Sequence, residues 1–97
     1  MESLPPKLVD QMTKMRLPRS GTFPFKPAIG RNRAGEMILE HRVVGFGSRK
    51  GKPGLLDTSG RIWIRDFAHA GVSAHWDVQL NDGADYLRVG YDGEVIA

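Results

Sequence analysis

The sequence contains no cysteine, which excludes disulfide bonds and thiolate metal sites. It also has no apolar run near the roughly 20 residues that a membrane-spanning helix needs. The first residues do not follow a signal-peptide pattern. We therefore expect a soluble domain without a membrane anchor in this fragment, whose 97 residues fold around one modest core.

Acidic residues are scarce in the first half of the chain. Residues 1–52 carry a net charge of +7, whereas residues 53–97 carry −4. A basic segment of this kind is typical of surfaces that bind phosphate backbones. The alternative interpretation is that the two oppositely charged halves attract each other within one fold.

The chain also changes in pattern from its start to its end. Residues 3–16 predict a helix, because Leu8, Met12 and Met15 recur at helical spacing behind two prolines. Residues 17–35 contain three prolines, which predicts an irregular connector.

Residues 36–97 predict an antiparallel sheet, because apolar residues alternate there and Asp-Gly pairs mark the last two turns. The predicted fold is a single α+β domain over residues 1–97, with the N-terminal helix packed on one face of a roughly four-stranded antiparallel sheet.

Residues 74–80 divide into two faces at the strand period of two. Extending this alternation to neighbouring strands predicts a core face made of Ile62, Ile64, Trp76, Val78, Leu80, Leu87 and Val89. The predicted opposite, exposed face contains Arg61, Trp63, Arg65, His75, Asp77, Gln79, Tyr86 and Arg88.

The exposed face is rich in groups that bind or cleave a phosphodiester. RNA supplies its own nucleophile, the 2′-hydroxyl, so cleavage requires a base, an acid and cations, but no metal. His75 is predicted to act as the base or the acid. Asp77 is predicted either to orient His75 or to exchange a proton itself. Arg88 or Arg65 is predicted to bind the phosphate. We expect no cofactor.

The glycine-rich loop over residues 45–54 carries Arg49, Lys50 and Lys52. It lacks the spacing of a nucleotide-binding P-loop. Two interpretations remain: a loop that contacts an RNA backbone, or an ordinary solvated loop.

Each candidate residue also has a structural interpretation. His75 can simply bond across the sheet, and Trp63 can cover a core edge. His69 is a possible second proton-transfer group, and His69, His75 and Asp77 are a possible zinc set, although their spacing matches no standard pattern. Asp57 and Asp66 are predicted to be turn residues.

Several segments together resemble a known family. These are residues 52–57, 60–63, 75–79, 86–89 and 92–95, of which the His-Trp-Asp-Val-Gln stretch is the most specific. Over residues 43–97 the chain resembles the C-terminal toxin domains of bacterial polymorphic toxin systems, and most closely those of polymorphic toxin type 17.

This resemblance implies a fold of the barnase, EndoU, colicin and RelE kind, shared with toxins of contact-dependent growth inhibition. It implies a tRNA-cleaving antibacterial domain, carried by a secreted or cell-surface effector into the cytoplasm of a target bacterium. The implied partners are a cognate immunity protein and, in some relatives, elongation factor Tu. The family pattern points to His75, Asp77 and Gln79, and less directly to Arg61.

We therefore predict a metal-independent endoribonuclease. The predicted catalytic residues are His75, Asp77, Gln79 and Arg88. The predicted RNA-binding residues are Arg61, Trp63, Arg65, Tyr86, Arg49, Lys50 and Lys52. The alternative is a β-rich module that binds RNA or protein without catalysis, using arginine and tryptophan side chains as anchors.

Overall fold

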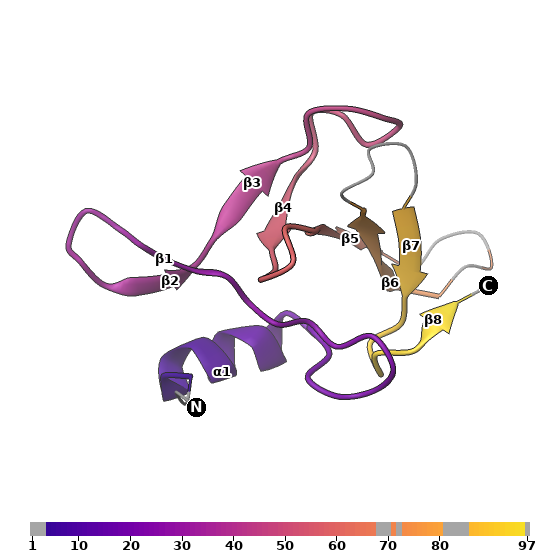
Figure 1. The fold of residues 1–97 in the computed structure, drawn as a ribbon. Coiled ribbons are helices and arrows are strands. Elements are labelled where there is room, and N and C mark those ends of the chain that lie inside the picture. The colour runs from indigo at the N-terminus through magenta and orange to yellow at the C-terminus, as the bar shows by residue number, and fades with distance from the viewer. Residues whose placement is uncertain (1–3, 68–70, 72, 81–85, 97) are drawn as a thin grey trace.

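The fold is built mainly from antiparallel strands. The computed structural model describes residues 4–67, 71, 73–80 and 86–96. Within them, strands β3 to β8 form one six-stranded sheet in which every strand lies beside its neighbour in the sequence, while β1 and β2 form a separate pair (Figure 1). The elements are α1 (Pro6–Lys14), β1 (Ile29–Arg31), β2 (Met37–Leu39), β3 (His41–Val43), β4 (Pro53–Leu56), β5 (Ile62–Asp66), β6 (His75–Gln79), β7 (Tyr86–Val89) and β8 (Val95–Ile96).

The predicted α+β class with a four-stranded, barnase-like sheet is therefore wrong: the part of the chain that the structure describes is mostly β, with one short helix. The predicted count of about four strands is too low, because short strands leave little pattern in the sequence. β3 is exposed at all three residues, so it shows no alternation, and β8, which follows the last predicted Asp-Gly turn, has only two residues. β1 lies inside the segment that was predicted to be irregular.

Helix α1 is shorter than predicted. Pro5 precedes it and Pro6 occupies its first turn, where the missing N–H costs nothing. After Lys14, Arg16 takes a left-handed conformation with φ of 62°, and the Leu17 N–H donates to the Met12 carbonyl. None of the described helices is long and apolar enough to span a membrane.

The main core lies between α1, the connector and one face of the sheet. Leu8 and Met12 of the helix belong to the same buried cluster as Trp63, Trp76 and Val78. The indole N–H of Trp76 also donates to the Arg16 carbonyl at 2.9 Å, which fixes the end of the helix to β6.

The opposite face of the sheet holds a smaller cluster of Val44, Leu56 and Ile62, with Ile64 packed against it. The predicted assignment of the β5 residues to the two faces of the sheet is therefore wrong, and the observed faces are the reverse of the predicted ones. Ile62 and Ile64 lie on the side of Asp77, because Ile64 is the cross-strand partner of Asp77 and Trp63 is the partner of Val78.

The β1–β2 pair is joined to the helix by a surface contact. Lys7 of α1 lies 3.5 Å from the carboxylate of Glu36, and the side-chain amide of Asn32 donates to the same carboxylate at 3.2 Å. The Asn32 bond, and then the charge of Lys7, lower the pKa of Glu36 below its usual value.

Gly54 in β4 occupies a position where a side chain does not fit. A Cβ atom there would lie 2.5 Å from the carbonyl oxygen of Trp63 and 2.6 Å from Cγ2 of Ile62. We expect Gly54→Ala to lower the free energy of unfolding by about 2 kcal/mol, because β4 must shift away from β5. Urea unfolding measures the change.

Gly45→Ala is the matched control, since a Cβ at Gly45 meets no atom within 4 Å. Its stability should change by less than about 0.5 kcal/mol, as at most surface positions. Equal effects of the two substitutions would contradict the tight approach of β4 to β5.

Candidate functional site

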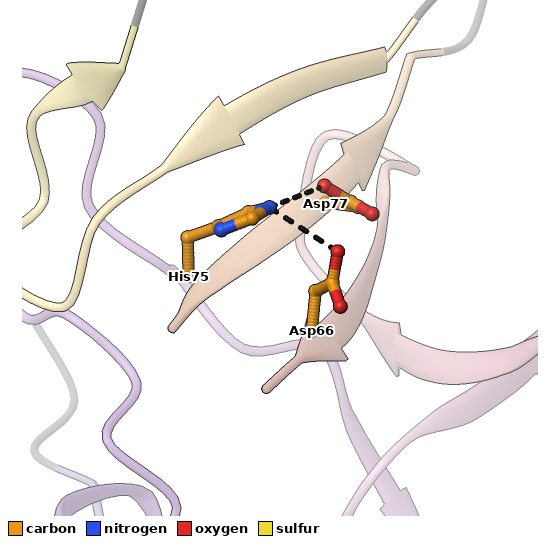
Figure 2. A group of neighbouring side chains, drawn as sticks. All are labelled: Asp66, His75 and Asp77. Atoms are coloured by element: carbon orange, nitrogen blue, oxygen red, sulfur yellow. Dashed lines mark hydrogen bonds and ion pairs between the residues drawn. The ribbon is translucent and has the colours of Figure 1, made fainter. Parts of the chain in front are cut away.

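Three side chains of strands β5 and β6 converge on one face of the sheet. Asp66 ends β5, and its cross-strand partner is His75, the first residue of β6. Asp77 follows His75 by two residues, so its side chain points to the same face. Figure 2 shows Asp66, His75 and Asp77 directed toward one another; we call them the acidic–imidazole triad.

The imidazole of His75 connects the two carboxylates. Its Nε2 lies 3.1 Å from Oδ1 of Asp77 and 3.4 Å from Oδ2 of Asp66. Its Nδ1 lies 2.8 Å from the carbonyl oxygen of Ser73, which can only accept a hydrogen bond, so Nδ1 carries a proton. The ring is therefore fixed through Nδ1, and its Nε2 faces the two carboxylates.

The triad differs in exposure from one residue to the next. The side chains of His75 and Asp77 are 1% and 3% exposed, whereas that of Asp66 is 32% exposed. Asp66 is therefore the member of the triad that is most accessible from outside.

The basic loop over residues 44–52 covers one side of the triad. Its ends are joined by hydrogen bonds, from the Val44 N–H to the Lys52 carbonyl and from the Gly51 N–H to the Val44 carbonyl, both 2.9 Å. This closure places Arg49 over the sheet, where Nη2 donates to Oδ2 of Asp77 at 2.6 Å. The guanidinium also lies 4.5 Å from the ring centre of Tyr86.

A pocket of about 100 Å³ opens beside the triad. Its lining includes two carboxylates, Asp66 and Asp77, together with the cationic residues Arg49 and Lys52. Arg65 also borders the pocket, but its Nε donates to the Tyr91 hydroxyl at 3.2 Å, on the other face of the sheet. We call this space the triad pocket.

Arg88 lies on the same face, on the next strand. It is the cross-strand partner of Asp77 and is exposed. With Ser73, His75 and Ile96 it lines a second pocket, of about 300 Å³. Cations therefore flank the triad on both sides, Arg49 and Lys52 on one and Arg88 on the other.

The structure does not bring all of the predicted RNA-binding residues to this face. Trp63 is fully buried in the main core, and its indole N–H donates to Asp57 at 3.0 Å. Arg61 forms an ion pair with Asp57 at 2.8 Å and lies over the ring of Phe23. Their predicted places on the polar face are therefore wrong, as is that of Arg65.

The remaining predicted residues that the structure describes lie in β6, β7 and the basic loop. Gln79 is buried on the same face and lines a pocket of about 250 Å³ with Arg42 and Phe46. Tyr86 supports Arg49, and Lys50 is exposed in the basic loop. His69, the candidate second histidine, lies outside the described residues.

Asp66 is the functional candidate that sequence reasoning assigned to a turn. The feature that identifies Asp66 as part of the site is the register of the β5–β6 hairpin, which places Asp66 opposite His75. Asp57, by contrast, accepts the backbone N–H groups of Ser59 and Arg61 at 2.9 Å, as expected of a turn residue.

The triad offers two chemical uses. Its exposed carboxylate can exchange a proton with a bound group, and the ligand atoms of its three residues, all within 4.8 Å of one another, can hold a metal ion. No family model, curated protein or solved structure matches the chain. The resemblance to type 17 toxin domains therefore stays a prediction.

Proposed function

We propose that the protein is a metal-independent endoribonuclease that cleaves RNA by attack of the 2′-hydroxyl. The observation that supports this function best is the triad pocket, where an accessible carboxylate lies beside two cationic side chains and in front of a buried imidazole. Groups of these three kinds are what phosphodiester cleavage requires when RNA provides the nucleophile.

In the proposed reaction, a scissile phosphate enters the triad pocket and Arg49 and Lys52 neutralise its oxygens. Asp66 accepts the proton of the 2′-hydroxyl as that oxygen attacks phosphorus. Lys52 can release a proton, which an arginine cannot, and it protonates the departing 5′-oxygen. Arg88 contacts the adjoining stretch of the RNA backbone.

His75 and Asp77 are positioning residues in this scheme. The two carboxylates share the Nε2 side of His75, so the imidazole fixes the direction of the Asp66 carboxylate. Asp77 in turn holds Arg49, which places a guanidinium beside the phosphate. His75 is not assigned a direct catalytic role here, although the sequence predicted one, because a side chain that is 1% exposed has little access to a substrate.

The biological setting follows from the family resemblance. We propose an antibacterial toxin domain that acts on tRNA, is delivered into a target bacterium and is neutralised by a cognate immunity protein. An immunity protein with an acidic surface would fit the cations that flank the triad, because opposite potentials favour association. Elongation factor Tu is a proposed helper in presenting the tRNA.

Cleavage should depend on Asp66. With total tRNA in the presence of EDTA, we expect Asp66→Asn to cut at least about 100-fold more slowly than the unsubstituted protein, because the amide cannot accept the proton. Initial rates on a denaturing gel measure the effect, and thermal unfolding checks that the variant is folded.

Asp10→Asn is the matched control, since Asp10 is an exposed carboxylate on α1. It should cleave at the original rate. Undiminished cleavage by Asp66→Asn would remove its assigned role. Salt-sensitive RNA binding with no product, even with cell extract, would instead favour the non-catalytic RNA-binding module. As a cellular readout, induced expression should arrest bacterial growth, and Asp66→Asn should relieve the arrest.

A further inference from the structure

We propose that the acidic–imidazole triad is a binding site for a transition-metal ion, Zn²⁺ in particular, and that the bound ion inhibits the enzyme. The inhibition rests on the proposed ribonuclease function, whereas the binding does not. Asp66, His75 and Asp77 supply the ligands, with one oxygen from each carboxylate and Nε2 from the imidazole.

The first argument is the direction of the imidazole. Because Nδ1 carries the hydrogen that is donated to Ser73, the neutral ring presents a lone pair at Nε2. That lone pair faces one oxygen of each carboxylate. A divalent metal ion placed between these three atoms would be bound by all of them.

The second argument is the spacing of the ligand atoms. Tetrahedral zinc with bonds of about 2.0–2.2 Å sets neighbouring ligand atoms roughly 3.3–3.6 Å apart. The two distances from His75 Nε2, 3.1 Å to Asp77 and 3.4 Å to Asp66, are close to this range. The two carboxylate oxygens lie within 4.8 Å of each other, so the carboxylates would move toward each other to admit the ion.

The third argument is the support around the ligands. A metal-binding histidine commonly donates its other N–H to a backbone carbonyl, as His75 does to Ser73. Arg49 bonds Oδ2 of Asp77 and leaves Oδ1 toward His75, so the guanidinium orients this ligand without occupying its metal-binding oxygen. The triad pocket gives access and room for a water as fourth ligand.

The ligand set also indicates which ion binds. One imidazole and two carboxylates suit Zn²⁺, whereas Mg²⁺ prefers six oxygen ligands in octahedral geometry. Two carboxylate charges balance a divalent ion. Once bound, the ion occupies the oxygen lone pair with which Asp66 would accept the 2′-hydroxyl proton, so cleavage should stop.

Calorimetric titration of the intact, metal-free protein with ZnCl₂ tests the binding without RNA. We expect saturation at one Zn²⁺ per chain and no competition from Mg²⁺. Asp66→Asn should weaken binding at least about 10-fold, and His75→Gln should weaken it more. His41→Gln, at an exposed histidine on β3, should bind Zn²⁺ unchanged. Absorption of bound Co²⁺ provides a second readout.

Binding that is absent, or unchanged in Asp66→Asn, would overturn the site; because Asp66 is partly exposed, this variant serves even if His75→Gln does not fold. Stoichiometric Zn²⁺ should abolish cleavage, and EDTA should restore it. Zn²⁺ that binds but leaves cleavage intact or stimulates it would overturn the inhibition. Binding without cleavage under any condition would instead reject the ribonuclease and leave the metal site standing.

Discussion

Asp77→Asn is expected to lower the free energy of unfolding by about 3 kcal/mol, near the lower end of the cost of breaking a buried ion pair by removing one partner. The carboxylate is 3% exposed, accepts a hydrogen bond from Arg49 at 2.6 Å and lies 3.1 Å from Nε2 of His75. Asparagine removes the charge that compensates the Arg49 guanidinium. Urea unfolding of the two proteins measures the difference.

Asp10→Asn again serves as the control, because its exposed carboxylate should contribute less than about 0.5 kcal/mol. A loss below about 1 kcal/mol for Asp77→Asn would mean that the ion pair behaves as a solvated surface pair. Because Asp77→Asn is expected to be unstable, substitution of the partly exposed Asp66 is the better test of catalysis.

Trp63→Ala is expected to cost about 4 kcal/mol of stability, as large-to-small changes at buried aromatic positions do. The side chain is fully buried and lies 5.2 Å from Phe25 and 6.4 Å from Trp76, measured between ring centres. Truncation leaves a cavity and also removes the indole partner of the buried Asp57. Denaturant unfolding measures this change.

Phe67→Ala is the comparison, since Phe67 is 65% exposed and should change stability by about 0.5 kcal/mol or less. Trp63→Ala also separates a core role from a base-stacking role. If the variant stayed as stable as the original protein and only bound RNA less well, Trp63 would be a binding residue and its placement in the core would be contradicted.

Alternation divided β6 into its two faces correctly because the faces differ in polarity, but the prediction that the polar face is exposed is wrong, since all five residues of β6 are buried. Trp76 and Val78 pack into the main core, while His75, Asp77 and Gln79 share the other face. It failed on β5, where Ile62, Trp63 and Ile64 are all apolar. Both faces of β5 are covered: Trp63 packs in the main core, and the two isoleucines pack in the smaller cluster. The sequence pattern therefore does not indicate which face of β5 points toward the main core.

Only those features of the site that depend on a single strand could be predicted. His75, Asp77 and Arg88 were assigned to one face, and the structure brings them there. Asp66 was missed because its importance depends on register with His75, and register is a property of two strands. The ion pair from Arg49 to Asp77 joins the basic and acidic halves of the chain.

The order of strands in the large sheet has a consequence for folding speed. Each strand from β3 to β8 pairs with the next one along the chain, so most sheet contacts close short loops. The triad lies entirely within the β5–β6 hairpin, over residues 66–77. Its three side chains can therefore come together as soon as this hairpin forms, without waiting for distant parts of the chain to meet. A chain that must regain its structure after being unfolded would assemble these three side chains early and locally.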